Sequence, residues 1–177
     1  MNNLKEPAFL EWLFHPGMLF QSDTKWWGDG GRRNVPHEGL DFRIFRLLQA
    51  ENCSINETTR VPVLFDGEIV RIIDDFLGQS VFIRHSYLNA DWMRLYSVYG
   101  HLIPARKIHA GEFIKEEDSI GTLANGRQVP SHLHISVAWI SDSLNRQDLD
   151  WKNILDTEKV TLVDPLTVIV CPYSVVK

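Results

Sequence analysis

Apolar and polar residues alternate over much of this chain, and turn residues interrupt the pattern at short intervals, as is typical of short strands. β-branched residues surround Gly67 in one such segment, which also favours a strand. The segments that predict strands are LDFRIF (40–45), VPVLFDGEIVRIIDD (61–75), SVFIRH (80–85), MRLYSVYGHL (93–102) and HLHISVAWI (132–140), with shorter strands and turns over 111–123. The chain is therefore predicted to be mainly β.

The two ends of the chain carry different patterns. Residues 1–30 mix aromatic residues with proline and glycine, and they lead into the breaker cluster Gly-Asp-Gly-Gly at 28–31. We interpret this segment as an N-terminal extension that packs on the domain, and residues 31–177 as the main and single domain. Near the other end, RQDLDWKNILD (146–156) places its apolar residues roughly on one side and predicts one short helix.

Composition limits the class of protein. The 177 residues, 44% hydrophobic and 23% charged, suit one globular domain with a substantial core. The formal charge is -5 and no basic run exceeds Arg32-Arg33, which argues against nucleic acid or an anionic membrane as a partner. No stretch approaches the roughly 18 apolar residues of a membrane span, and no secretion signal is visible. Cys53 and Cys171 form no Cys-x-x-Cys motif, so neither a thiolate zinc cluster nor a disulfide framework is indicated.

Two short signatures stand out among the seven histidines: HEGLD at 37–41 and HLH at 132–134. On a strand, residues two apart project from the same face about 7 Å from each other, so His132 and His134 can address one small volume. With His37, Asp41 and one histidine of the pair, three nitrogen or oxygen ligands are available. A tetrahedral zinc would then keep one open position, which is typical of a catalytic site.

Each signature also has a simpler interpretation. A His-x-x-x-Asp pair often makes only a surface hydrogen bond. Two histidines on an apolar strand are more telling, because buried imidazoles need polar partners. His101, after Tyr99-Gly100, is compatible with an ordinary turn. The other three histidines, His15, His85 and His109, have no comparable context, and we expect no catalytic role for them.

With these residues in view, the chain resembles the lysostaphin-like (LytM-type) zinc metallopeptidases, which cut the peptide part of bacterial peptidoglycan. The resemblance covers roughly residues 30 to 170, and its motifs occur in the family's order. They are GRRNVPHEGLDF for the Gly-x-Arg and His-x-Gly-x-Asp entry, VPVLFDGEIV, GQSVFIRH, YGHL, AGEFIKEEDSIGTL, SHLHISV and the closing DPL. Several motifs in the right order are much more specific than any one of them.

The resemblance implies a fold and a division of labour. The family fold is an antiparallel β-sheet with a groove over the sheet, where the site lies. His37, Asp41 and His134 would bind one zinc ion per chain, whereas His101 and His132 would be the catalytic histidines that do not bind metal. One would accept a proton and the other would stabilise the oxyanion or protonate the leaving amine, in an order that the sequence leaves open. The candidate residues of the substrate groove are Trp26, Trp27 and Arg127.

The chain also departs from the family pattern. NGRQVPS stands where members commonly have a Gly-Ser/Thr-rich loop before the His-x-His, and Ile135-Ser136 follows where Phe-Glu is frequent. Some members place a tyrosine just upstream of the first ligand to help hold the oxyanion. This stretch offers Trp26 and Trp27 but no tyrosine, so we expect a different substrate groove and one oxyanion contact fewer.

Three functions are compatible with these residues. The first is a zinc-dependent endopeptidase that cuts peptidoglycan cross-links or stem peptides. The second is a non-catalytic relative that binds a partner or a cell-wall peptide, and the third is a D-Ala-D-Ala-type zinc carboxypeptidase, which the spacings fit less well. The family implies a cell-envelope or extracellular location, although no export signal is visible, and the oligomeric state is left open.

Overall fold

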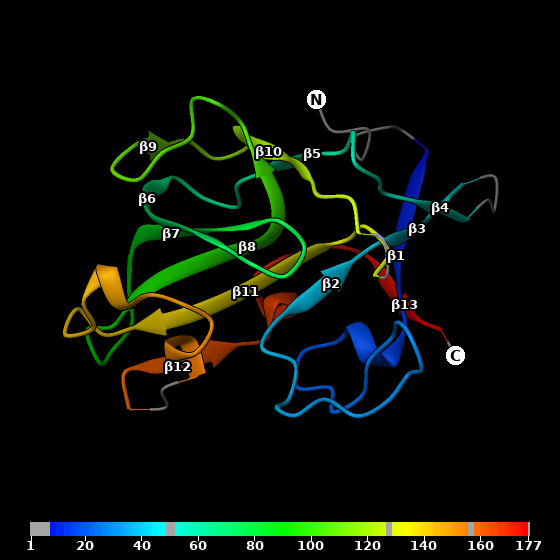
Figure 1. Cartoon of the computed structure of the whole chain (residues 1–177), viewed down its shortest axis with the longest axis horizontal. Coiled ribbons are helices and arrows are strands. Elements are labelled where there is room, and N and C mark those ends of the chain that lie inside the picture. The colour runs from blue at the N-terminus through cyan, green and yellow to red at the C-terminus, as the bar shows by residue number, and fades with distance from the viewer. Residues whose placement is uncertain (1–7, 49–51, 127–128, 156–157, 177) are drawn as a thin grey trace.

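Thirteen strands form two sheets in the computed structural model, which describes residues 8–48, 52–126, 129–155 and 158–176. The larger sheet has the order β12-β11-β8-β7-β6-β9, with β10, β5 and β2 attached to it, and its pairings are antiparallel (Figure 1). Its strands are β2 (Leu40–Phe42), β5 (Arg60–Pro62), β6 (Gly67–Asp74), β7 (Gln79–Leu88), β8 (Arg94–Pro104), β9 (Phe113–Ile114), β10 (Ser119–Leu123), β11 (Leu133–Ile140) and β12 (Val160–Val163).

The smaller sheet joins the two ends of the described chain, in the order β13-β1-β3-β4. Its strands are β1 (Phe9–Phe14), β3 (Ile44–Leu47), β4 (Asn52–Ser54) and β13 (Tyr173–Val175). β1 is followed by the short 3-10 helix η2 (Pro16–Met18), and Trp12, Phe14 and Met18 belong to the larger apolar cluster of the core. The described part of the N-terminal segment thus packs on the rest of the fold, while the domain boundary at residue 30 stays a prediction.

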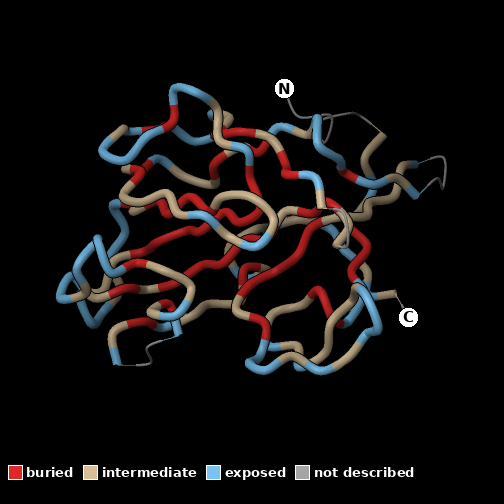
Figure 2. The backbone as a smooth tube through the Cα atoms, viewed as in Figure 1, coloured by how far each residue is buried: buried red, intermediate tan, exposed pale blue. Residues whose placement is uncertain are grey.

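Both faces of the central strands are covered. Alternate residues of β8 divide between two apolar clusters, with Leu95 and Tyr99 in the larger one and Tyr96 and Val98 in the smaller. Figure 2 shows the buried residues running along the central strands. The prediction of a mainly β fold on an antiparallel sheet is therefore confirmed.

Long predicted strands are divided where glycine and turn residues intervene. The segment 61–75 becomes β5 and β6, and β6 begins at Gly67. A Cβ atom at Gly67 would lie 2.6 Å from Ile83 Cγ2 and 2.7 Å from the Arg84 carbonyl oxygen, so only glycine allows this close approach to β7. The remaining predicted strands correspond to β2, β3, β7, β8 and β11.

The C-terminal helix differs from the prediction. Residues 146–155 form two 3-10 helices, η3 (Arg146–Asp148) and η4 (Asn153–Leu155), in place of one continuous helix. The Asp150 carboxylate accepts hydrogen bonds from the backbone N–H groups of Lys152 and Asn153, at 2.9 and 2.7 Å. Such local side-chain bonds compete with helical ones and break the element in two. A final 3-10 helix, η5 (Pro165–Thr167), precedes β13.

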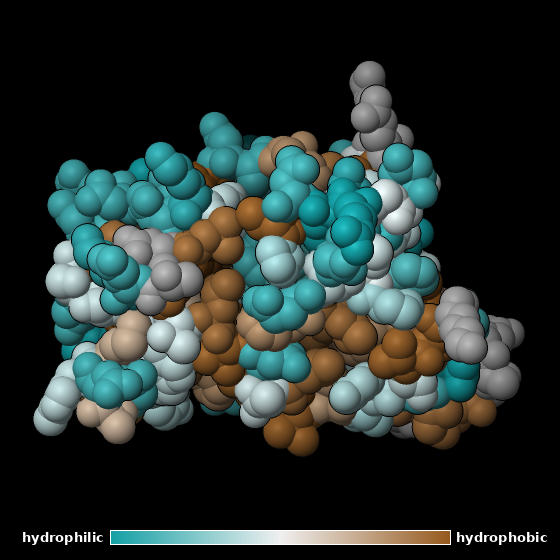
Figure 3. All heavy atoms as spheres, turned by 90° about the horizontal axis from the view of Figure 1, so that it is seen from below, coloured by the Kyte–Doolittle hydropathy of each residue, from teal (hydrophilic) through white to brown (hydrophobic). Residues whose placement is uncertain are grey.

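The outer surface is mixed in character. On the face drawn in Figure 3, apolar residues gather between hydrophilic ones. In the part of the chain that the structure describes, no helix is long and apolar enough to cross a bilayer.

Tyr99 offers a test of the core. Its fully buried hydroxyl accepts a hydrogen bond of 2.8 Å from the Leu64 backbone N–H. We expect Tyr99→Phe to lower the free energy of unfolding by about 1–2 kcal/mol, because the half-buried Leu64 N–H group loses its partner. Urea denaturation measures the change, and Tyr87→Phe, at a residue 51% exposed, is the control that should stay near wild type. An unchanged midpoint for Tyr99→Phe would contradict this account of the core.

Candidate metal centre and catalytic pocket

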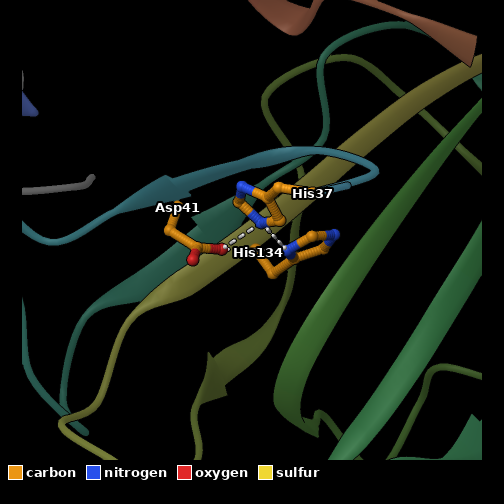
Figure 4. A group of neighbouring side chains, drawn as sticks. All are labelled: His37, Asp41 and His134. Atoms are coloured by element: carbon orange, nitrogen blue, oxygen red, sulfur yellow. Dashed lines mark hydrogen bonds and ion pairs between the residues drawn. The ribbon is translucent and has the colours of Figure 1, made fainter. Parts of the chain in front are cut away.

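Strand pairing brings His134 beside His37 and Asp41, which lie 97 and 93 positions earlier in the sequence. Asp41 on β2 and His134 on β11 are direct partners in the antiparallel register. His37 lies in the loop before β2, and its side chain turns back toward the other two (Figure 4). All three side chains are buried, and together they form a group that could hold a metal ion.

The distances among these three residues fit a zinc ion. His37 Nε2 lies 3.2 Å from Asp41 Oδ1 and 3.1 Å from His134 Nδ1. Asp41 Oδ1 and His134 Nδ1 are 2.9 Å apart. Zinc bonds of about 2.0–2.1 Å in tetrahedral geometry separate two ligand atoms by about 3.3 Å. The three atoms therefore need to move by only a few tenths of an ångström to surround the ion.

Hydrogen bonds on the far side of the His37 and His134 rings direct the lone pairs of the other ring nitrogens toward the centre of the three-residue group. His37 Nδ1 lies 3.0 Å from the Leu19 carbonyl oxygen, which can only accept, so Nδ1 carries the proton and Nε2 the lone pair. His134 Nε2 lies 2.9 Å from Ser136 Oγ, which can accept its proton in the same way. Outer partners of this kind orient the imidazoles of metal sites.

The charge state of the three residues also suits a cation. Burial alone would raise the pKa of Asp41, but the adjacent imidazoles of His37 and His134 outweigh it and hold the pKa well below its ordinary value. Burial lowers the pKa of His134, which favours the neutral imidazole that binds metals. An ionised carboxylate and neutral imidazoles are the forms that zinc requires.

Asp41 Oδ2, the oxygen that faces away from the three-residue group, has its own partners. Trp26 Nε1 donates a hydrogen bond of 2.6 Å to Oδ2, and Arg33 Nη2 lies 3.6 Å from the same atom. Arg33 is itself fixed by hydrogen bonds to the carbonyl oxygens of Gly17 and Thr24, at 3.1 Å each. Oδ1 is thereby left for the three-residue group.

A cavity of about 250 Å³ opens over this group, and both predicted catalytic histidines line it. The ring centroids of His101, on β8, and His132, just before β11, are 4.7 Å apart. His132 Nδ1 donates to the Pro130 carbonyl oxygen at 2.8 Å, and its Nε2 lies 3.8 Å from Asp41 Oδ1. Burial lowers the pKa of His132 to about 4, so this imidazole is neutral near pH 7.

The predicted groove residues have different positions. Trp27 lines the cavity and stacks on His132 at 6.3 Å between ring centroids, while the Arg33 guanidinium lies 4.6 Å above the Trp27 ring. Trp26 contacts His132 edge-on at 5.0 Å and holds Asp41. Arg127 lies outside the described residues.

Six residues of the site were not singled out from the sequence: Arg33, Glu38, Asp75, Phe76, Ser136 and Trp151. Arg33 had a signal, because it belongs to the GRR segment before His37. Trp151 lines the cavity and packs on His134, with ring centroids 5.1 Å apart, although its segment predicted only a short helix. Asp75 contacts His101, and no motif marks it.

The remaining histidines have structural partners. His85 is buried between the Asp66 carbonyl oxygen and Ser97 Oγ, at 2.9 and 2.8 Å. His15 Nδ1 accepts the Gly17 N–H at the start of η2, and His109 is largely exposed. None of the three lines the cavity.

Comparison with known proteins agrees with this geometry. A family model described as Peptidase family M23 matches residues 36–148, which extend from the residue before His37 past the end of β11. The match covers more than half of the chain, so the chain belongs to peptidase family M23. The resemblance to lysostaphin-like peptidases is thereby confirmed. No curated protein matches the chain significantly.

Two solved structures show the same fold. CbpA from L. salivarius REN is 22% identical, with a TM-score of 0.52 over 88% of this chain and 86% of that one. The catalytic domain of the antimicrobial peptidase lysostaphin from Staphylococcus simulans is 19% identical, with a TM-score of 0.51 over 85% of this chain and 88% of that one. At this identity the likeness establishes the fold, which is lysostaphin-like.

Proposed function

We propose that this protein is a zinc-dependent endopeptidase that hydrolyses peptide bonds in peptidoglycan cross-links or stem peptides. The observation that carries the proposal is the buried triangle of His37 Nε2, Asp41 Oδ1 and His134 Nδ1, with distances of 2.9–3.2 Å, beneath a cavity that two further histidines line. Membership of peptidase family M23 and the lysostaphin-like fold support the same reaction class.

His37, Asp41 and His134 would hold the zinc ion. When bound there, zinc supplies Lewis-acid chemistry, because it polarises a carbonyl group and lowers the pKa of water toward ~7. The neutral imidazoles and the single carboxylate leave the centre a net positive charge. Trp26 and Arg33 keep Asp41 from rotating its second oxygen toward the cavity.

Proton transfer falls to His101 and His132. In the neutral state of His132, Nδ1–H donates to Pro130 and the lone pair is on Nε2. His101 has the same arrangement, since its Nδ1 faces Asp75. An Nε2 lone pair can take the proton of the attacking water and then donate it to the leaving amine nitrogen, so that one amide and one water yield a carboxylic acid and an amine.

The cavity walls orient the peptide. Trp27, Phe76 and Trp151 supply apolar surface around the histidines, and Arg33 supplies a positive charge. Closure of these side chains around a substrate would exclude water other than the nucleophile, which strengthens every electrostatic interaction in the site.

Digestion of purified peptidoglycan tests this function. We expect mass spectrometry to find new amino termini inside cross-links or stem peptides after incubation with the zinc-loaded protein, and none with protein stripped by a chelator. Release of terminal D-alanine alone would favour the carboxypeptidase function. Binding of peptidoglycan without any cleaved bond would favour the non-catalytic function.

A further inference from the structure

His101 lies in a strand but has an unusual backbone conformation. Its φ is +66°, in the left-handed region that residues other than glycine seldom adopt. The other described non-glycine residues with positive φ, Gln21, Trp92 and Glu117, all lie outside strands. Strain of this kind at one position persists only where the surroundings hold it in place.

A β-bulge accompanies this conformation. Gln79 pairs with Leu102 and Val81 with Tyr99, so three steps along β8 face two steps along β7. The extra residue of β8 therefore lies in the Gly100-His101 stretch. Bulges redirect side chains, and they are frequent beside active sites. The bulge here accompanies a histidine side chain that lines the cavity.

One carboxylate holds both the backbone and the ring of His101. Asp75 Oδ2 accepts the His101 backbone N–H at 2.8 Å, and Asp75 Oδ1 lies 3.1 Å from His101 Nδ1. Asp75 is the first residue of the connection between β6 and β7 and lies 26 positions before His101 in the sequence. Its side chain is only 2% exposed, so water scarcely competes for these bonds.

Asp75 is itself immobilised. Its Oδ1 accepts the backbone N–H groups of Leu77 and Gly78 at 2.8 Å each, and its Oδ2 accepts the Ser80 hydroxyl at 2.6 Å. Ser80 Oγ in turn accepts Trp151 Nε1 at 3.1 Å. Burial alone would raise the pKa of Asp75, but the hydrogen bonds that it accepts from His101 and Ser80 outweigh it and place the pKa far below its ordinary value. The carboxylate is ionised, and every one of its contacts is a donor.

We propose that Asp75 is a positioning residue for His101, which fixes its bulged backbone and holds the neutral ring with the proton on Nδ1, so that Nε2 exchanges protons in the cavity. A carboxylate can only accept, so Nδ1 must donate. When Nε2 takes a proton, the same carboxylate stabilises the imidazolium, as the aspartate does in a Ser-His-Asp triad. The catalytic part of this proposal rests on the proposed peptidase function, whereas the tautomer does not.

Two variants separate positioning from a purely structural role. In Asp75→Asn, an NH2 group in place of Oδ1 can donate to Nδ1 and so permits the other tautomer, while the oxygen in place of Oδ2 still accepts the His101 backbone N–H. The Leu77 and Gly78 N–H groups then lose their acceptor. The matched control is Asp74→Asn, because Asp74 is the adjacent residue and its exposed carboxylate accepts a hydrogen bond from Gln79 Nε2, at 2.9 Å, and none from His101 in the described chain.

The experiment is side-chain 15N NMR of the zinc-loaded protein, with the His101 signals identified by their loss in His101→Asn. We expect the Nδ1–H tautomer in the wild type and in Asp74→Asn, and a shift toward Nε2–H in Asp75→Asn. With a soluble cross-linked peptidoglycan fragment, kcat of Asp75→Asn should fall about 10²-fold or more, while KM and zinc content stay near wild type.

Each result has a defined meaning. An Nε2–H tautomer in the wild type would overturn the proposal, even if Asp75→Asn failed to fold. A kcat within twofold of wild type for a folded Asp75→Asn would overturn its catalytic part. If the wild type cleaves nothing but shows the Nδ1–H tautomer, the proposed function fails and the positioning of His101 stands.

Discussion

The His134→Ala variant is expected to bind no zinc near neutral pH and to cleave no peptidoglycan, whereas the wild type carries about one zinc per chain. The variant loses one of three converging ligand atoms, Nδ1, which lies 2.9–3.1 Å from the other two. Loss of an outer-sphere partner alone costs about 10–100-fold in metal affinity, so loss of a ligand should cost more.

Elemental analysis of untreated protein, together with titration by added zinc, measures this effect. His109→Ala is the matched control, because it removes an imidazole that is 72% exposed and does not line the cavity. Zinc should raise the melting temperature of the wild type and of His109→Ala but not that of His134→Ala, since only a folded site binds the ion. Wild-type zinc content in His134→Ala would contradict the ligand assignment.

Local rules predicted that His132 and His134 share one face, whereas His101 was assigned to the site only through the family resemblance. The two-residue spacing of His132 and His134 puts both on one face wherever the segment is extended, and β11 is extended from Leu133. Residues 40–45 were predicted as a strand, and the pairing of β2 with β11 then places Asp41 beside His134. Alternation and spacing thus determine where these side chains point once the sheet forms.

The contacts that support the site could not be predicted in this way. Asp75 reaches His101 only because a turn joins β6 to β7 and a bulge interrupts β8. Trp26 reaches Asp41 through a loop whose path depends on non-local hydrogen bonds, such as that of Arg33 to Gly17. No periodic pattern describes such contacts, because they join segments through irregular backbone.

Departures from the family pattern have a physical meaning in the structure. Ser136, which follows His134 by two residues, lies on the same face of β11 and contacts the outer nitrogen of that imidazole. Ile135 points to the opposite face and joins the larger apolar cluster. Ser136, one of the two residues that depart from the family pattern, therefore helps to orient the imidazole of His134.

The helix over residues 146–156 shows a limit of periodicity. Of its apolar side, Leu149 and Ile154 are buried, whereas Leu155 is 37% exposed. Nevertheless the side chains of Asn145 and Asp150 accept hydrogen bonds from nearby backbone N–H groups, and each of these caps begins a separate turn. The pattern thus agrees with burial at two of three apolar positions, whereas capping determines the backbone conformation.

His101→Asn is expected to retain zinc but to lose about 10²–10⁴-fold in kcat, the share of the rate that a positioned proton carrier supplies. Asparagine tolerates the left-handed backbone of this position, and its amide can donate to Asp75. His101→Ala should show the same kinetic loss with lower stability, because alanine lacks both advantages.

Metal content is what distinguishes His101 from the ligands. His101 Nδ1 faces Asp75 at 3.1 Å and not the three-residue group, so its removal should leave zinc bound at the wild-type level. Parallel measurement of zinc and of hydrolysis in His101→Asn and His134→Ala therefore separates a proton carrier from a ligand. If both variants lose zinc equally, His101 belongs to the metal site and the division of roles is wrong; if His101→Asn keeps zinc and full activity, His132 alone carries the proton.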